Sequence, residues 1–138
     1  MKELFLEVIT PSKTAYQGNI ISVTIPGTLG SFQVLYNHAP LLSSFEIGTI
    51  KVVDEGGTVK HFATGGGTVE VLKNKVLVLA ESFESPEEIN LERAKSAMER
   101  AKERLKEKSA QIDVDRAQAA LARAMNRISL GNKLSKSV

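Results

Sequence analysis

The sequence of 138 residues contains no cysteine and no tryptophan. Without cysteine, neither a disulfide framework nor a thiolate metal site is possible. The only histidines are His38 and His61, and no cluster of carboxylates accompanies either, so no metal centre is expected. No serine, histidine and acid stand at a spacing that argues for an activated nucleophile. The residues therefore predict no catalytic set and no required cofactor.

Long hydrophobic runs are also missing. The longest strongly apolar run, 76–80, is far shorter than the roughly 20 residues that cross a bilayer as a helix. Glu3 and Glu7 interrupt the apolar start of the chain, which is unlike a signal peptide. We therefore expect no direct membrane insertion, and any attachment to a membrane would be through partners.

Aromatic residues are few, and they are confined to one part of the chain. All seven precede residue 84, whereas all six arginines follow residue 92. Residues 1–84 hold six basic against eight acidic residues, a net charge of −2, and residues 85–138 hold twelve against eight, a net charge of +4. This asymmetry predicts two parts, a body at 1–84 and a basic arm at 85–138. The eight acids of the arm and its lack of aromatic side chains for base stacking argue against nucleic acid as a partner.

The body has the pattern of short β-strands. Segments 4–9 and 20–25 are rich in apolar and β-branched residues, and two hairpins are predicted, 49–53 with 58–62 and 68–72 with 76–80. Short strands with repeated turn signals and no helical periodicity favour a sandwich or barrel. Gly65-Gly66-Gly67 lacks the lysine that follows a phosphate loop, so we expect a bulge or turn there.

Two loops of the body stand out, at 26–32 and 37–44. They fit ordinary turn chemistry, with Leu41 and Leu42 in the core, and they equally fit a contact surface, because loops at the ends of sandwiches often carry binding. The sequence leaves both interpretations open.

The arm has helical periodicity. A start at Ser85-Pro86 competes with a start at Asn90, and Asp113 is a candidate cap for a second helix that ends at Gly131. Apolar residues recur at a 3, 4, 3, 4 spacing in each helix: Leu91, Ala94, Met98, Ala101 and Leu105, then Val114, Ala117, Leu121, Ala124 and Ile128. Matching seams predict an antiparallel helical hairpin. Since four of ten seam positions are alanine, we expect an arm that opens at modest cost.

The arginines repeat at spacings of 7 and 4 in both helices: Arg93, Arg100 and Arg104, then Arg116, Arg123 and Arg127. Either spacing keeps the side chains on one helical face. They form either a solvated charged surface or two basic stripes that converge on a triphosphate or an acidic partner.

Several motifs together resemble a known family. They are Asn37-His38-Ala39-Pro40-Leu41-Leu42 after a glycine-bounded loop, the triple glycine, Ile89-Asn90-Leu91-Glu92-Arg93-Ala94, and the segment 120–127. Over nearly the whole chain they are similar to the epsilon chain of the F-type ATP synthase. The resemblance implies a ten-stranded β-sandwich followed by an antiparallel two-helix hairpin, and a chain with no active site of its own.

The family's properties give the expected partners. The resemblance implies a subunit of the rotating central stalk that contacts the gamma chain, the ring of c subunits and the catalytic alpha/beta head. Its helical arm, when extended, inhibits ATP hydrolysis. The expected location is the cytoplasmic face of a bacterial plasma membrane, through the complex, with a plastid thylakoid as the alternative.

The resemblance also assigns residues. It implies that one end of the sandwich contacts the rotor and ring through Gly27, Leu29, Gly30, Ser31, Phe32, His38, Ala39, Pro40, Leu41 and Leu42. In some members the hairpin binds regulatory ATP, and the matching positions are Glu84, Ile89, Asn90, Arg93, Arg100, Arg123 and Arg127. Asn90 stands where that motif has aspartate, so we expect ATP binding to be weakened or lost. A free-standing ATP-sensing module and a nucleic-acid-binding module are the rival interpretations.

Overall fold

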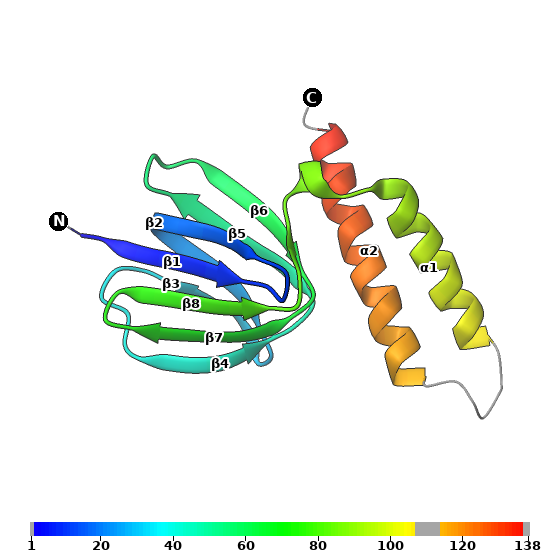
Figure 1. Cartoon of the computed structure of the whole chain (residues 1–138), viewed down its shortest axis with the longest axis horizontal. Coiled ribbons are helices and arrows are strands. Elements are labelled where there is room, and N and C mark those ends of the chain that lie inside the picture. Colours follow the sequence, from blue (N-terminus) through cyan, green and yellow to red (C-terminus); the bar gives the residue numbers. More distant parts are fainter. Residues whose placement is uncertain (1, 107–113, 137–138) are drawn as a thin grey trace. The chain divides into compact units, whose positions relative to one another are not determined.

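The computed structural model describes residues 2–106 and 114–136. They fold as two compact units, Met1–Ser85 and Pro86–Val138. The first unit is built of strands and the second of helices (Figure 1). No α-helix precedes residue 86 in the part of the chain that is described, as the sequence predicts.

The β-sandwich has nine strands among the described residues, where the resemblance implied ten. They are β1 (Leu4–Ile9), β2 (Thr14–Gly27), β3 (Gly30–Val34), β4 (Leu41–Phe45), β5 (Gly48–Asp54), β6 (Val59–Thr64), β7 (Gly67–Leu72), β8 (Lys75–Ala80) and β9 (Phe83–Glu84). Both predicted hairpins are confirmed, as β5–β6 and β7–β8. The sequence did not predict β3, β4 or β9, which are short and follow loops rich in turn residues.

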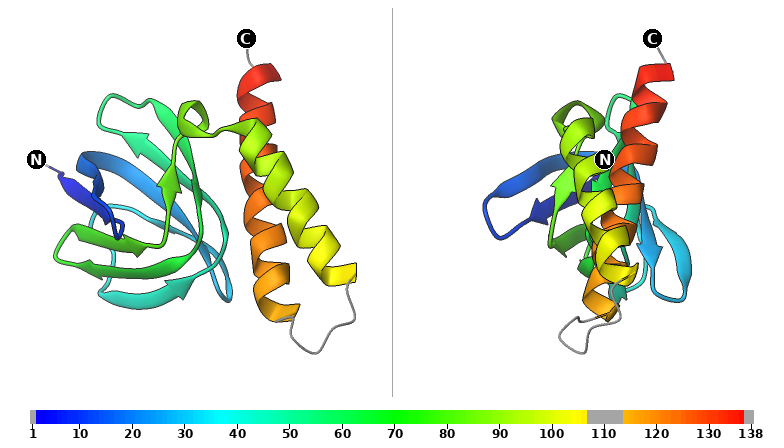
Figure 2. Two further views of the ribbon diagram at one scale, coloured as in Figure 1. Left: turned by 45° about the vertical axis from the view of Figure 1, so that its right-hand side comes forward. Right: turned by 90° about the vertical axis from the view of Figure 1, so that its right-hand side faces the viewer.

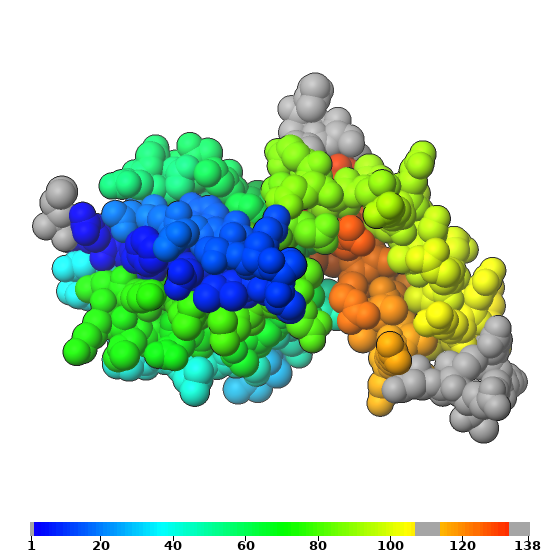
Figure 3. All heavy atoms as spheres, in the orientation of Figure 1, coloured from blue at the N-terminus to red at the C-terminus, as the bar shows by residue number. Residues whose placement is uncertain are grey.

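The long strand β2 closes the sandwich. Its first half pairs with β1, from Thr14 to Ile20, and its second half pairs with β3 and β5. One unbroken strand of 14 residues thus takes part in two sets of pairings. Strands β1, β8, β7 and β4 lie side by side in that order (Figure 1), and in the space-filling view the blue and green parts of the sandwich, which include β1, β7 and β8, adjoin without a gap (Figure 3).

Alternation along the strands builds the core. In β1, Leu4, Leu6 and Val8 are buried, while the residues between them are half-buried. A fully buried side chain of this kind stabilises the fold by about 1.5–3 kcal/mol relative to an exposed one. All members of the core cluster lie between residues 4 and 83, so the sandwich has a core of its own.

Alternation also corrects the prediction that two adjacent leucines are both in the core. Leu41 packs against the core from the first position of β4, but Leu42 points the other way and is 77% exposed. Successive residues of a strand face opposite sides of the sheet, so two neighbours on one strand do not share one core face. The triple glycine spans the expected turn, between the end of β6 at Thr64 and the start of β7 at Gly67.

The arm consists of a single 3-10 turn, η1 (Pro86–Glu88), and two helices, α1 (Leu91–Lys106) and α2 (Val114–Lys136). The helices lie side by side and run in opposite directions (Figures 1 and 2), which confirms the antiparallel hairpin. The cap at Asn90 is confirmed over the start at Ser85-Pro86, since α1 begins at Leu91. The predicted cap Asp113 lies outside the described residues.

The prediction that Gly131 ends the second helix is wrong, because α2 continues to Lys136. Glycine lowers helix stability by about 1 kcal/mol relative to alanine in a helix interior. Its place inside α2 therefore has another cause, which lies in its contacts.

Candidate functional site

The turn between β2 and β3 is the most exposed apolar feature of the sandwich. Leu29 at its tip is fully exposed, and Gly30 adopts a φ of 125°, which side-chain-bearing residues rarely adopt. A Cβ on Gly27 would lie 2.6 Å from the carbonyl oxygen of Gly30 and 2.9 Å from the ring of Phe32. The two glycines thus allow a tight turn that presents a leucine to the outside.

Polar contacts fix this turn against β4. The hydroxyls of Thr28 and Ser44 are hydrogen-bonded at 2.8 Å, and the N–H of Glu46 donates to the carbonyl of Pro26 at 2.9 Å. A shallow groove between the turn and β4 is lined by Gly27 to Phe32 together with Ser43 and Ser44. Leu42 lies two residues before Ser44 and on the same outer face of β4. We call the outer surface that runs from Leu29 in the turn along β4 to Leu42 the turn surface.

The segment from His38 to Pro40 lies at the other end of the sandwich. Strand β3 leads away from the turn at Gly30, and β4 returns toward it, so that Phe45 is paired with Gly27 and Leu41 with Val71. Four residue steps of a strand separate Leu41 from Phe45 by about 13 Å. The expectation that both predicted contact segments lie at one end is therefore wrong, and only Leu42 joins the turn surface.

A pair of asparagines holds that far loop. Asn37, with a φ of 65°, donates its backbone N–H to the side-chain oxygen of Asn74 at 2.6 Å, and the Asn74 amide donates back to Asn37 Oδ1 at 3.4 Å. The N–H of His38 donates to the carbonyl of Leu35 at 3.1 Å. Asparagine tolerates the left-handed region better than most residues, which explains its use at this loop.

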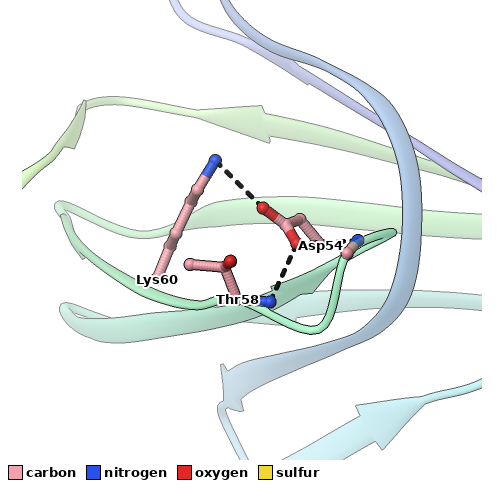
Figure 4. A network of polar contacts seen from close by, with 4 residues as sticks. Asp54, Thr58 and Lys60 are labelled. Carbon is pink, nitrogen blue, oxygen red and sulfur yellow. Dashed lines mark hydrogen bonds and ion pairs between the residues drawn. The ribbon is translucent and has the colours of Figure 1, made fainter.

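Asp54 organises the β5–β6 hairpin by its side chain (Figure 4). Its Oδ1 accepts from the N–H groups of Thr58 at 2.9 Å and Gly56 at 3.0 Å, and Lys60 Nζ lies 3.4 Å from Oδ2. The hydrogen bond from Thr58, helped by Lys60, holds the pKa of Asp54 below its ordinary value. Burial of Tyr16, beside Lys60, raises the pKa of its hydroxyl. These contacts give Asp54 a structural role in the turn.

Four alanines form the centre of the helical hairpin. Ala94 and Ala101 of α1 and Ala117 and Ala124 of α2 are buried, while the larger seam residues are half-buried or, for Val114, exposed. The structure thus confirms the thin seam. A buried methyl contributes about 0.8 kcal/mol, less than half of what a leucine contributes. The centre of the seam therefore buries less apolar surface than a seam of leucines would.

The arginines flank this seam in both helices. Each residue advances about 100° around a helix, so Arg93 and Arg100 lie roughly 100° to one side of Ala94 and Ala101. Arg116 and Arg123 stand in the same relation to Ala117 and Ala124. In an antiparallel pair whose seams face each other, equal offsets in the same sense place both stripes on one face of the hairpin. The two basic stripes of the sequence therefore share a face.

Burial on this basic face is uneven. Arg93 and Arg100 are exposed, whereas Arg123 and Arg127 are half-buried. Ile89, next to the cap of α1, is buried, and Asn90 is exposed with its side-chain oxygen in the cap. Six of the seven residues expected to bind a nucleotide are thus in the hairpin unit. Glu84 belongs to the other unit, in β9.

Within 2–106 and 114–136, no three histidine or acidic side chains are grouped so that they could hold a metal ion. No helix in these ranges is long and apolar enough to cross a membrane.

Two features of the structure are not predicted from the sequence. The Thr28–Ser44 hydrogen bond joins residues 16 apart, and no local pattern signals such a pair. The sequence predicts a helix end at Gly131, and no local pattern distinguishes this glycine, followed by Asn132, from one that ends a helix.

The fold and its surfaces define a two-part protein, a sandwich with an exposed apolar turn followed by a basic helical arm. Comparison with known families gives the particular one. Residues 3–86 match the family described as the beta-sandwich domain of the ATP synthase delta/epsilon chain, and residues 87–130 match its long alpha-helix domain. The chain belongs to the delta/epsilon chain family of ATP synthases.

Individual relatives agree with this family. The chain is 41% identical over 123 residues to the ATP synthase epsilon chain of Desulforamulus reducens, covering 89% of this chain and 92% of the relative. It is 41% identical over 128 residues to that of Syntrophomonas wolfei, covering 93% of each. Over 104 residues it is 46% identical to that of Pelotomaculum thermopropionicum, covering 75% and 77%.

Two solved structures share the fold. A chain in the Euglena gracilis mitochondrial ATP synthase, determined with OSCP, F1 and the c-ring, matches with a TM-score of 0.79 at 20% identity, covering 91% of this chain and 79% of that one. A chain in the central stalk and c-ring structure of the Tetrahymena thermophila mitochondrial ATP synthase matches with a TM-score of 0.60 at 17% identity, covering 97% and 96%.

Proposed function

We propose that the chain is a non-catalytic subunit of the central stalk of an F-type ATP synthase. In this role it couples proton flow through the ring of c subunits to ATP synthesis in the alpha/beta head. The observation that carries the proposal is the family match over both parts of the chain, from residue 3 to residue 130. The proposed location is the cytoplasmic face of a bacterial plasma membrane, through the complex.

The proposed docking body is the sandwich, with the gamma chain and the ring of c subunits as partners. Leu29 and Leu42 support this role, since both are large apolar side chains that the fold leaves exposed. The turn that carries Leu29 is fixed by the Thr28–Ser44 hydrogen bond, so little conformational entropy is lost when it binds.

The proposed regulator is the arm, which inhibits ATP hydrolysis when its hairpin opens and reaches the catalytic head. Its alanine seam supports this, because a thin seam costs little to separate. The basic face supports contact with acidic surfaces of the head once the helices are extended.

A second candidate function is a free-standing ATP sensor whose arm closes on the nucleotide. The observation that favours it is the shared basic face, since guanidinium groups from two helices on one face suit a triphosphate. Asn90 weighs against it, because the amide lacks the carboxylate that the resemblance expects at this position. We propose that regulatory ATP binds weakly or not at all.

Co-purification separates the two candidates. We expect that a tagged chain, expressed in the organism from which the sequence comes, co-purifies with the gamma chain, the c ring and the alpha and beta chains in fixed proportion. A chain recovered alone under conditions that keep the synthase intact would contradict the stalk role and favour the free sensor.

A further inference from the structure

Gly131 lies in the interior of α2 and faces the base of α1. A Cβ built on it would lie 2.6 Å from Leu91 Cδ2, 3.2 Å from Leu91 Cγ and 3.7 Å from Ile89 Cγ2. Real Cβ atoms rarely approach another carbon so closely, so the absence of a side chain is what permits this contact. The residue before it, Leu130, is buried, and so is Ile89.

The choice of glycine here opposes its helix propensity. Apart from proline, glycine is the least favourable residue for a helix interior. Glycine commonly ends a helix, but Gly131 does not have this role, since α2 continues to Lys136. The close approach of Leu91 and Ile89 is the remaining physical reason for a residue without a side chain at this position.

We propose that Gly131 seats a clasp that holds the hairpin closed at its base. The clasp consists of Ile89, Leu91, Leu130 and Gly131. Leu91 is half-buried, and Ile89 and Leu130 are the only apolar side chains larger than alanine that are fully buried in the described part of the hairpin. Along the rest of the seam the fully buried side chains are alanines, and the larger apolar residues are half-buried. The most complete burial of large apolar side chains is therefore at one end of the hairpin.

The clasp lies next to the start of α1. Ile89 precedes Asn90, whose side chain caps that helix. The N–H of Ile89 donates to the carbonyl of Pro86 in η1 at 3.3 Å. Loss of the Ile89–Gly131 contact releases the last turns of α2 and the segment leading into α1 together. Opening of the hairpin then starts at the base of the arm.

Helix propensity and packing against Leu91 predict opposite effects of a substitution at Gly131 on the stability of the hairpin. The clasp can therefore be tested by substituting this residue. If helix propensity alone mattered, Gly131→Ala and Gly131→Leu would stabilise the hairpin. If the clasp holds it, Gly131→Ala loosens it slightly, because Leu91 must turn aside, and Gly131→Leu loosens it more. We expect amide hydrogen exchange in α1 to be about fivefold faster or more in the leucine variant of the full chain, with the sandwich unchanged.

Two controls accompany the measurement. Ser129→Leu adds the same side chain at an exposed position of α2 and should leave exchange in α1 unchanged. In a Leu91→Ala background, Gly131→Ala should no longer speed exchange, because the two Leu91 atoms that the new methyl crowds are gone and Ile89 Cγ2, at 3.7 Å, is at an ordinary contact distance. Exchange in Gly131→Leu equal to or slower than in the parent chain would overturn the clasp, and so would equal acceleration by Ser129→Leu.

The consequence for regulation depends on the proposed inhibitory function and is measured separately. A loosened clasp should make the full-length Gly131→Leu chain a stronger inhibitor of ATP hydrolysis by a catalytic complex lacking this subunit. Faster exchange without stronger inhibition would overturn the inhibitory role of the open arm and leave the clasp standing. Unchanged exchange would overturn the clasp whatever the inhibition.

Discussion

The side-chain oxygen of Asn90 accepts a hydrogen bond of 3.0 Å from the backbone N–H of Arg93. This contact satisfies one of the N–H groups that the first turn of a helix leaves without an intrahelical partner. It also ties the position that departs from the nucleotide-binding motif to the first arginine of the basic face. The cap requires only an oxygen, which asparagine, aspartate and serine all supply.

The first prediction separates the cap from the charge at this position. Asn90→Asp keeps the cap and adds a carboxylate, which accepts stronger hydrogen bonds than an amide does. We expect ATP to bind the Asp variant roughly tenfold more tightly than the parent chain, measured by calorimetric titration. Asn90→Ser, which keeps the cap without the charge, should bind no better than the parent. Micromolar affinity of the parent chain for ATP would show that Asn90 does not weaken the site.

The second prediction concerns the entry into β7. A Cβ on Gly67 would collide with the carbonyl oxygen of Leu79 on the paired strand β8. Gly67→Ala should therefore lower the free energy of unfolding by about 1–3 kcal/mol, measured by urea denaturation. Gly18→Ala is the matched control, because nothing lies within 4 Å of a Cβ at that position. Equal stability of the two variants would contradict the close approach of β7 and β8.

The third prediction concerns the pH dependence of stability. The hydrogen bond from Thr58 and the contact with Lys60 lower the pKa of Asp54 in the folded chain below its ordinary value of 3.8. The unfolded chain therefore takes up this proton at higher pH than the folded chain. The stabilisation by Asp54 is complete above the unfolded pKa and disappears as the pH falls through the lower folded pKa.

Asp54→Asn tests this directly. We expect the variant to unfold at a lower urea concentration than the parent at neutral pH, and the difference to shrink as the pH is lowered toward about 3 and below. Glu55→Gln, at the exposed neighbouring carboxyl, provides the control. A difference between Asp54→Asn and the parent that stays constant with pH would contradict an ionised, hydrogen-bonded Asp54.

The fourth prediction concerns the turn surface. Leu29→Ser and Leu42→Ser remove exposed apolar side chains and should change the free energy of unfolding by less than about 0.5 kcal/mol. Both should reduce the amount of gamma chain and c ring that co-purifies with the tagged chain, because the surface loses apolar contact area. Ile21→Ser, an exposed apolar residue outside this surface, is the control. Unchanged recovery with both leucines replaced would exclude the turn surface as a rotor contact.

Sequence reasoning succeeded where a pattern is local. Alternation around Asp54-Glu55-Gly56-Gly57 and around Asn74 predicted both hairpins, and the 3, 4 spacing of apolar residues predicted the helical seam. The family motifs gave the order of sandwich and hairpin. Each of these depends on residues close together in the chain.

The errors concern contacts between distant residues. Leu91, 40 positions earlier in the chain, occupies the space that a side chain at Gly131 would need. The local sequence around this glycine does not contain that contact and predicts a helix end. The separation of His38 from the turn at Leu29 follows from the pairing of β4 with β7, which no local pattern contains. Even the shared basic face required the antiparallel arrangement, because parallel helices would place the same stripes on opposite faces.

Inhibition of a catalytic complex that lacks this subunit tests the central claim most directly. Addition of the full-length chain should lower the rate of ATP hydrolysis, and the chain ending at residue 85, which retains the whole sandwich core, should bind without lowering it. A chain that binds the complex and leaves the rate unchanged would contradict a regulatory arm.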